Sequence, residues 1–455
     1  MYFDKNPQRL HWVLLLAVTI FSLYMNATAV GTTLIDGLIR GDARDYLAYA
    51  FNLKTHGVYS NAMPLAQSVI PHPDALRAPG YAFFIAPFVD AGRNDLGLTA
   101  VLYLQALLGA LTTLFSMLIF RKIMPFWAAI ACGLLTAISP HLINISVYIL
   151  TESLFTFLLI THVYTLVLAR ERANTLLFIL SGLLLAASWL VRPTTMLLVA
   201  VYILVFAWAV YRKQIGWRAL ACLILPFFIA FSGWSIRNEL AIGRMSDPQL
   251  SVNFIHHGSY INMMYQDKPE TYGYPYRFET RKINSVGDAI TLTIDHFKAE
   301  PARYMGWILF GKPVQFLSWD LTESIGDAVI YAQPKTPYAD NGLFIQTHRL
   351  AKLAHLPMML LAAAACIYFL FKRDTANFAL QITGIVVLYF IAFHAIGSPF
   401  PRYSIPIRPL CYGLAFWLLI QLCPLLLKKQ QDGVQTDADN GKAPANSAPE
   451  GGKSQ

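Results

Sequence analysis

The sequence predicts an all-α polytopic membrane protein with about ten transmembrane helices. Its 455 residues are 56% hydrophobic and only 13% charged, a balance typical of chains that surround their helices with lipid. Long apolar runs recur along most of the chain, and clusters of basic residues separate them in a regular alternation. These observations exclude a large soluble protein.

Most of the apolar runs are close to the roughly 20 residues that an α-helix needs to cross the hydrocarbon core of a bilayer. They lie at 11–30, 98–120, 125–141, 150–169, 174–191, 194–211, 217–235, 351–371, 376–396 and 407–427.

Basic residues favour the cytoplasmic side of a membrane, and here their clusters fall on one side of the ten-helix arrangement. The clusters are Lys5 with Arg9, Arg121 with Lys122, Arg170 with Arg172, Arg212 with Lys213 and Arg218, Lys372 with Arg373, and Lys428 with Lys429. We therefore predict cytoplasmic termini and two long outer segments, 31–97 and 236–350. The net charge of +9 then reflects topology, and we expect no nucleic-acid partner. A bacterial inner membrane, with its lipids as partners, is the expected location.

We expect one membrane domain over residues 1–430. A disordered cytoplasmic tail is expected over 431–455, because that stretch is rich in small and polar residues. In the first outer segment, the helical spacing of apolar residues between Asp45 and Lys54, with Gly57 following, predicts a juxtamembrane helix.

The second outer segment is rich in tyrosine and tryptophan, residues that favour the headgroup level of a membrane. Its most apolar part, 304–319, contains Lys312 and Pro313 near the middle. We predict an amphipathic surface helix there. An eleventh span would place the later basic clusters outside, against the charge pattern.

Asp42 and Asp45 lie just beyond the outer end of the first apolar run, in the sequence GDARDYLAYA. A carboxylate at this level is suited to accept a proton from an attacking hydroxyl or amine in a glycosyl transfer. The alternative is structural, because aspartate is a preferred N-cap and this pair resembles a capping arrangement. The sequence leaves both interpretations open.

Arginines gather on the same predicted side: Arg77 in RAPGY, Arg192 in WLVRP, and Arg402 with Arg408 before the last apolar run. Guanidinium groups bind phosphate through paired hydrogen bonds, so these residues form a candidate rim around a phosphate. Interface arginines also snorkel to lipid headgroups, which is the structural alternative.

Glu152, in TESLF, begins an apolar run at the same level, where a carboxylate is costly unless it is paired or hydrated. It is a candidate to orient an arginine, to bind a divalent cation or to support the base. A favourable position at a helix N-terminus is the alternative.

Other polar residues carry weaker signals. His256 and His257 are adjacent, and side chains next to each other point apart, so we expect no metal site there. Gln105 and His162 lie within apolar runs, where polar side chains usually form hydrogen bonds between helices. The five cysteines lie in or beside apolar runs and predict no disulfide framework.

The order of these features resembles the membrane glycosyltransferases of the GT-C class, especially the protein mannosyltransferase and aminoarabinose transferase type, or glycosyltransferase family 39-like proteins. The matching residues are Asp42 with Tyr46, RAPGY at 77–81, TESLF at 151–155, the run ending at Arg192 and Pro193, WSIRN at 234–238, and Arg402 with Tyr403.

The resemblance implies a GT-C-like fold, with juxtamembrane helices over an outward-facing cavity, and a polyprenyl-phosphate-linked sugar donor. It implies that Asp42 is the base and that Tyr46, Tyr81 and Tyr403 position substrate. One departure is Ala43, where several relatives have a second acid, so the roles of Asp42 and Asp45 stay open. The chain also lacks the long soluble domain of oligosaccharyltransferases, which favours transfer of a single sugar.

We therefore expect an inverting glycosyltransferase that acts on the periplasmic face and transfers a hexosyl or pentosyl group to a lipid, glycan or protein acceptor. Asp42, Asp45 and Glu152 would be its catalytic residues, and Arg77, Arg192 and Arg402 would bind the donor phosphate. The sequence identifies no particular cofactor, and dependence on a divalent cation is left open. The alternatives are a transporter or flippase of lipid-linked sugars, and a polysaccharide polymerase or ligase.

Overall fold

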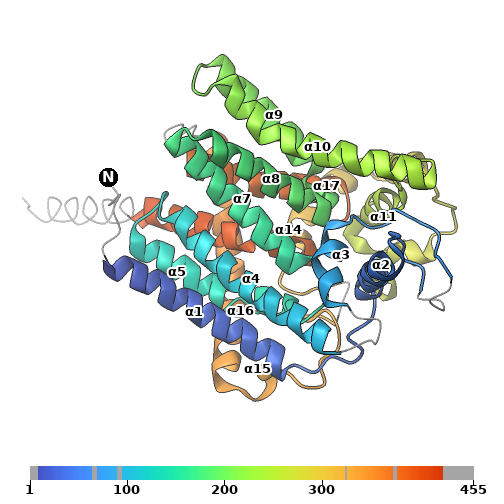
Figure 1. The fold of residues 1–455 in the computed structure, drawn as a ribbon, viewed down its shortest axis with the longest axis horizontal. Coiled ribbons are helices and arrows are strands. Elements are labelled where there is room, and N and C mark those ends of the chain that lie inside the picture. Colours follow the sequence, from blue (N-terminus) through green and yellow to red (C-terminus); the bar gives the residue numbers. More distant parts are fainter. Residues whose placement is uncertain (1–8, 64–68, 90–94, 323–324, 372–376, 424–455) are drawn as a thin grey trace, which may run out of the picture.

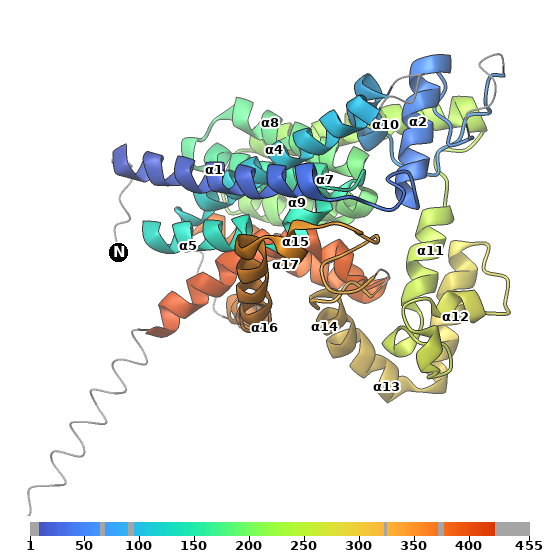
Figure 2. The ribbon, with the colours of Figure 1, turned by 90° about the horizontal axis from the view of Figure 1, so that it is seen from below.

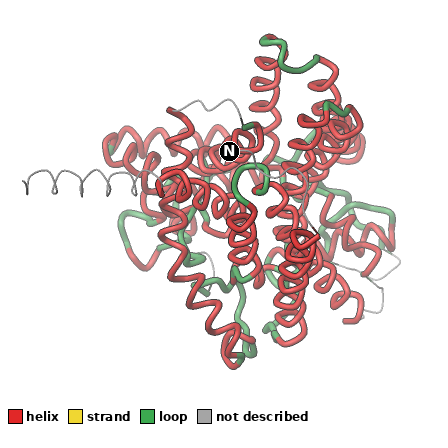
Figure 3. Tube along the Cα trace, turned by 90° about the vertical axis from the view of Figure 1, so that its left-hand side faces the viewer, coloured by secondary structure: helices red, strands yellow, loops and turns green. Residues whose placement is uncertain are grey.

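The computed structural model describes residues 9–63, 69–89, 95–322, 325–371 and 377–423 (Figure 1). Within these ranges the chain folds into helices and loops, and its only β pairings are isolated bridges between Leu34 and Lys335 and between Gly326 and Val329 (Figure 3). The predicted all-α fold class is confirmed.

Each predicted apolar run forms a helix. They are α1 (Arg9–Thr32), α4 (Asp95–Phe120), α5 (Phe126–Ala137), α7 (Glu152–Arg172), α8 (Thr175–Val191), α9 (Met196–Tyr211), α10 (Trp217–Ile242), α16 (Gly342–Phe371), α17 (Phe378–Ile396) and a final helix over 408–423. In the described part of the chain, 8 helical stretches are long and apolar enough to span a membrane. The shorter apolar helices are α5 and α8. The chain is an integral membrane protein, and ten spans stay a prediction.

The helices differ in how far the protein itself covers them. α7 packs against α4, α8 and α17, and most of its side chains are buried. By contrast α9, α10 and α16 expose large apolar side chains, such as Leu204, Leu240 and Leu353. Such exposure is favourable where lipid replaces water, because lipid tails are as apolar as leucine.

Polar side chains join the inner helices, as predicted for Gln105 and His162. His162 on α7 contacts Ser181 of α8 through Nδ1 at 3.0 Å and the Tyr202 hydroxyl of α9 through Nε2 at 3.1 Å. Gln105 on α4 accepts from the Tyr81 hydroxyl and donates to the carbonyls of Ser146 and Tyr148. Both predictions of interhelical hydrogen bonds are confirmed.

Segments that were predicted to share a side of the membrane do lie at the same end of the bundle. The turns after α4, α7 and α9 lie at the left of Figure 1, while α2, α3 and α11 lie at the right. At the left end, Lys122 and Glu171 form an ion pair of 2.7 Å. Which end faces the cytoplasm stays a prediction.

The first outer segment contains α2 (Asp42–His56), α3 (Gly80–Ile85) and the short 3-10 helix η1 (Ala86–Phe88). Gly57 ends α2 with φ of 66°, the left-handed conformation that glycine adopts without a steric penalty. The predicted juxtamembrane helix is therefore confirmed, and it begins at Asp42 instead of Asp45.

The second outer segment lies beside the bundle at the end that carries α2 (Figure 2). Its helices are short, and α10 and α16 extend into it from the membrane. The short helices of this segment are α11 (Gln249–Gly258), η3 (Ile261–Met263), η4 (Pro269–Thr271), η5 (Pro275–Phe278), α12 (Val286–Ala299), α13 (Pro301–Gly306), the π-helix η6 (Trp307–Gly311), α14 (Lys312–Phe316) and α15 (Pro337–Asp340). Two further short helices, α6 (Pro140–Ile145) and η2 (Pro193–Thr195), lie outside it, in connections between apolar helices.

The region of the predicted surface helix over 304–319 is formed by α13, η6 and α14, which follow one another without a gap over 301–316. Its charged residue, Lys312, does not face outward. Lys312 is buried, and its Nζ donates to the Gly397 carbonyl at 3.0 Å, next to the end of α17. Burial lowers the Lys312 pKa to about 7. Phe310 and Val314 are instead 72% and 71% exposed, so the apolar side of this segment is the one presented to its surroundings.

The boundary of the membrane domain at residue 430 and the tail over 431–455 lie outside the described residues, and both stay predictions.

Replacing Gln105 by leucine should destabilise the protein, because it leaves the Tyr81 hydroxyl and two buried carbonyls without their partner. We expect the free energy of unfolding to fall by about 1–3 kcal/mol. Thermal unfolding in detergent measures this, with Leu107→Ala as control because Leu107 is 41% exposed on the same helix. Equal midpoints for the two variants would contradict the bridging role.

Candidate active site

Six charged side chains from four distant parts of the chain meet at the end of the bundle that carries α2. They form a chain of ion pairs in which acids and arginines alternate: Asp45, Arg77, Asp42, Arg402, Glu152 and Arg192. They are six of the seven charged residues that the sequence singled out as catalytic or phosphate-binding. The structure brings these six together, and the seventh, Arg408, lies elsewhere.

Arg77 joins the two aspartates of the first outer segment. Its Nη2 lies 2.8 Å from Oδ1 of Asp42 and 2.8 Å from Oδ2 of Asp45, and its Nε donates to the same Asp45 oxygen at 3.0 Å. The aspartates are three residues apart on the first turn of α2, so their side chains share a face. The N-cap of α2 is Gly41, with no side-chain capping bond, so the capping interpretation of the aspartates is wrong.

Arg402 connects these aspartates to the helix ends. Its Nη2 lies 3.1 Å from Oδ2 of Asp42, and its Nε donates to Oε1 of Glu152 at 2.6 Å. Arg192, at the end of α8, reaches the same Glu152 oxygen through Nη1 at 2.7 Å. Glu152 is fully buried. Two guanidinium groups therefore stabilise one carboxylate that would be costly to bury alone.

Two of the arginines also contact aromatic rings through their guanidinium groups. The Arg77 guanidinium lies 5.5 Å from the Tyr46 ring centre, and that of Arg192 lies 4.9 Å from the Tyr403 ring centre. Tyr81 is fully buried, contacts Tyr46 edge-on, and donates its hydroxyl to Gln105. Of the three tyrosines proposed to position substrate, Tyr46 and Tyr403 border the charged residues, while Tyr81 lies behind Tyr46.

Exposure and proton affinity differ along the network. The side chains of Asp42 and Asp45 are 33% and 28% exposed, whereas that of Glu152 is 0% exposed, so the site opens at the aspartates. Burial raises the Asp42 pKa, but attraction to Arg402 and Arg77 outweighs it, and the net result is a pKa of about 2. Asp42 is a carboxylate at neutral pH with both oxygens paired.

Arg408 does not belong to the site, and its predicted place on the phosphate rim is wrong. It is fully buried and donates through Nη2 to the Ser318 carbonyl at 2.8 Å. Residues 401–407 form the 3-10 helix η7 (Pro401–Ile407), and the chain turns inward after it. Arg402 and Arg408 therefore point to different surroundings although both precede the last span.

The described residues contain no cluster of three or more His, Cys, Asp or Glu side chains placed to hold a metal. In the network an arginine stands between each carboxylate and the next, so the donor set does not fit a divalent cation, and we assign no step to one. His256 contacts the Tyr260 hydroxyl at 2.9 Å, and His257 stacks on Tyr276.

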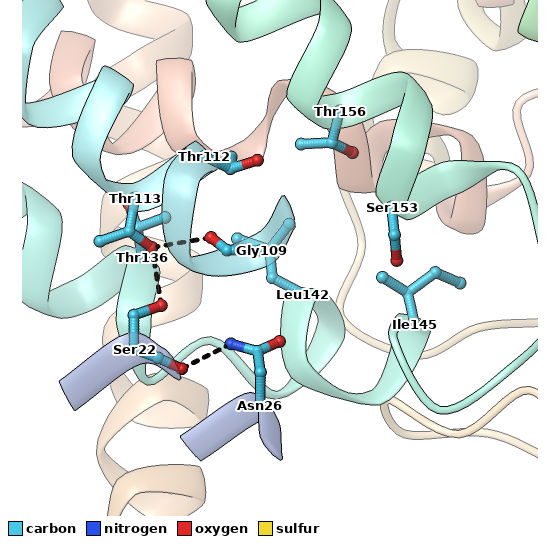
Figure 4. Close-up of a pocket in the computed structure, with 10 residues that line it drawn as sticks. All are labelled: Ser22, Asn26, Gly109, Thr112, Thr113, Thr136, Leu142, Ile145, Ser153 and Thr156. Atoms are coloured by element: carbon cyan, nitrogen blue, oxygen red, sulfur yellow. Dashed lines mark hydrogen bonds between the residues drawn. The ribbon is translucent and has the colours of Figure 1, made fainter. Parts of the chain in front are cut away.

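A small polar cavity lies deeper in the bundle, between α1, α4, α5, α6 and α7 (Figure 4). Hydroxyl groups line most of it, with Asn26 and Ser153 at its edge. Its volume is about 10 Å³, which suits a single water molecule and not a sugar. Although Ser153 follows Glu152 in sequence, this cavity contains none of the charged residues.

Sequence reasoning missed a second cluster, which surrounds the main chain at Arg77. It consists of Tyr49, Tyr59, Asp74 and Arg237. Arg237 belongs to WSIRN, a stretch that carried part of the resemblance without being given a role. The isolated arginine near the outer end of an apolar run was the available signal.

Residues 72–234 match the family model described as dolichyl-phosphate-mannose-protein mannosyltransferase. The resemblance to the GT-C class is confirmed. The matched range contains Arg77, Glu152 and Arg192, while Asp42 and Arg402 lie outside it. A search of the curated proteins finds no significant match.

Solved structures share the GT-C fold of this chain. An oligosaccharyltransferase from Archaeoglobus fulgidus in its apo form aligns with a TM-score of 0.52 at 12% identity, covering 93% of this chain and 52% of that one. The same protein tethered to an acceptor peptide gives a TM-score of 0.51 at 12% identity, covering 90% and 49%. The chain thus spans about half the length of these proteins. ArnT from Cupriavidus metallidurans, bound to undecaprenyl phosphate, aligns with a TM-score of 0.47 at 14% identity, covering 95% and 64%.

Replacing Glu152 by glutamine should strongly destabilise the protein, because the positive charges of Arg192 and Arg402 lose their buried counterion. The expected loss is about 3–5 kcal/mol of unfolding free energy. Glu171→Gln is the matched control, since its partner Lys122 is 37% exposed and the pair contributes at most about 1 kcal/mol. Thermal unfolding of both variants in detergent tests this, and similar midpoints would contradict it.

Proposed function

We propose that this protein is a glycosyltransferase that moves a single sugar from a polyprenyl-phosphate donor to an acceptor at the outer face of the membrane, with inversion at the sugar. The observation that carries the proposal is the meeting of three carboxylates and three arginines at one end of the bundle. The match to a family described by a dolichyl-phosphate sugar donor supports the same chemistry.

The network divides into two halves of opposite charge. Arg402, Glu152 and Arg192 carry a net charge of about +1, while Asp42, Asp45 and Arg77 carry about −1, counting one charge for each group. The pair between Arg402 and Asp42 joins the halves. The positive half suits the phosphate of a lipid-linked sugar, and the negative half suits a group that accepts a proton.

In the proposed reaction the donor phosphate takes the place of Asp42 beside Arg402, with Arg192 and Arg77 adjacent. The acceptor hydroxyl or amine gives its proton to Asp42 as its lone pair attacks C1 of the sugar. The bond between C1 and the phosphate oxygen breaks, and polyprenyl phosphate leaves with the bonding electrons. The arginines stabilise the negative charge that develops on this leaving group.

The second outer segment supplies a surface for the acceptor. Aromatic contacts lead from the charged network into this segment: Tyr403 contacts Phe400, Phe400 contacts His257 of the segment, and His257 stacks on Tyr276 with ring centres 3.6 Å apart. Rings of this kind bind sugars and other amphipathic groups. We propose that the acceptor approaches from this side, and that this end of the bundle faces the periplasm of a bacterial inner membrane.

Converting Asp42 to asparagine should abolish transfer while the protein still binds the donor, because the amide cannot accept the proton. The decrease in turnover should exceed about a hundredfold. The measurement is release of free polyprenyl phosphate from a panel of polyprenyl-phosphate sugars by purified protein in lipid, with donor binding followed separately. Asp45→Asn is the matched comparison and should retain more activity.

Three other outcomes of that experiment would redirect the proposal. Loss of turnover only in Asp45→Asn would transfer the role of base to Asp45. Sugar-dependent release that survives both substitutions would favour a polymerase or ligase mechanism that uses other residues. No release from any donor, with membrane extract supplied as acceptor, would favour a transporter.

The pH dependence should differ between the free protein and the donor complex. In the free protein Asp42 has a pKa of about 2, so kcat/KM for the donor should not fall through its protonation between about pH 4 and 7. When phosphate occupies Arg402, Asp42 loses part of the attraction that lowers its pKa, while burial still raises it. The acid limb of kcat should therefore lie at higher pH than that of kcat/KM, and coincident limbs would contradict this.

A further inference from the structure

The described residues 58–63 and 69–79, which present Arg77 to the aspartates, form no helix or strand. Here side chains form the hydrogen bonds with backbone amides and carbonyls that neighbouring backbone groups would form in a helix or strand. Asp74 accepts from the Asn61 amide at 2.7 Å through Oδ2 and from the Leu76 amide at 3.1 Å through Oδ1. A single carboxylate thus fixes both sides of this loop.

Two stacked tyrosines hold the main chain of Arg77 itself. The Tyr59 hydroxyl donates to the carbonyls of Arg77 and Ala78, each at 3.1 Å. The Tyr49 hydroxyl donates to Asp74 and accepts from the Arg77 amide at 3.3 Å. The two rings are buried and their centres lie 4.1 Å apart.

Arg237 closes this cluster from α10, a helix more than 150 residues further along the chain. Its Nη1 donates to the Asp74 carbonyl at 2.8 Å and its Nη2 to the Tyr59 carbonyl at 3.1 Å. The guanidinium also lies over the rings of Tyr59 and Trp234, at 5.4 and 5.0 Å from their centres. The Arg237 side chain therefore contacts the loop on both sides, near Tyr59 and near Asp74.

We propose that Arg237 is a positioning residue, which orients the guanidinium of Arg77 toward Asp42 and Asp45 by fixing the loop that carries it. The consequence for catalysis rests on the glycosyl transfer proposed above, whereas the consequence for the loop does not. Arg237 itself does not contact the ion-pair network.

The surroundings of Arg237 indicate that it holds the loop specifically and contributes little to the packing of the bundle. Ile236 and Leu240 on α10 are 60% and 84% exposed, although Asn238 between them is buried, so the apolar side chains at this end of the helix contribute little buried surface. The arginine uses its donors on backbone carbonyls, and hydrogen bonds from a charged group are stronger than those between neutral groups. Removing it should therefore loosen the loop more than the bundle.

The first test does not depend on the reaction. In Arg237→Met, amide hydrogen exchange at Asn61, Asp74, Leu76 and Arg77 should accelerate about tenfold, since these amides are held inside the cluster. Arg244→Met is the control, because Arg244 lies just after α10, is 54% exposed and pairs only with Asp247 among the described residues. Unchanged exchange in Arg237→Met would overturn the proposal.

The second test measures the consequence for the site. The KM for the polyprenyl-phosphate donor should rise about tenfold in Arg237→Met, with a thermal midpoint close to that of Arg244→Met. Arg237→Lys, which keeps the charge and one donor, should recover part of this loss. Tyr59→Phe, which removes only the hydroxyl that binds the Arg77 carbonyl, should raise the KM in the same direction.

The two tests separate the ways in which the ideas can fail. Faster exchange together with an unchanged KM would overturn the positioning role while leaving glycosyl transfer intact. Faster exchange in a protein that shows no transfer from any donor, even as wild type, would support the loop contact and reject the proposed function. A thermal midpoint that falls as far as in Glu152→Gln would show that Arg237 is a general stability residue and overturn the proposal.

Discussion

Glu152 lies in the membrane domain without solvent exposure, and one of its two carboxylate oxygens, Oε1, pairs with both Arg192 and Arg402. A buried carboxylate of this kind is stable only with its partners in place, so it holds the end of α8 and the start of η7 against the start of α7. The position of Arg402 then determines where Asp42 lies, because Arg402 is the link between the helix ends and the first outer segment. The remainder of the site depends on this one buried charge.

The helical architecture could be predicted from the sequence, because the bilayer constrains both the length of a spanning helix and the side on which basic residues lie. Apolar length predicted the helices, and basic clusters predicted which connections share an end. The same rules placed Asp42, Arg77, Glu152 and Arg402 on one side of the membrane, whereas the contacts between them became visible only in the structure. The spacing of apolar residues likewise predicted α2, because Gly57 and the helical repeat are local signals.

Tertiary packing determined what the sequence did not reveal. Asp42 resembled a capping residue, yet Arg77, which is distant in sequence, takes its carboxylate and leaves Gly41 as the N-cap. Arg408 and Lys312 resembled surface cations, yet each donates to a backbone carbonyl in the interior. A charge pattern indicates the depth of a residue in the membrane and gives no information about the direction in which it points.

The division of the network also explains why its two halves come from such different parts of the chain. Asp42, Asp45 and Arg77 belong to one outer segment, whose loop is held by side chains and by Arg237 from α10. Arg192, Glu152 and Arg402 belong to the ends of membrane helices, at the depth where a lipid-linked phosphate resides. In the proposed reaction the donor phosphate takes the place of Asp42 beside Arg402, so donor binding in the positive half releases the carboxylate of the negative half. Under this proposal Asp42 would gain proton affinity when a donor is bound, which would couple the two substrates without a change in the helical bundle.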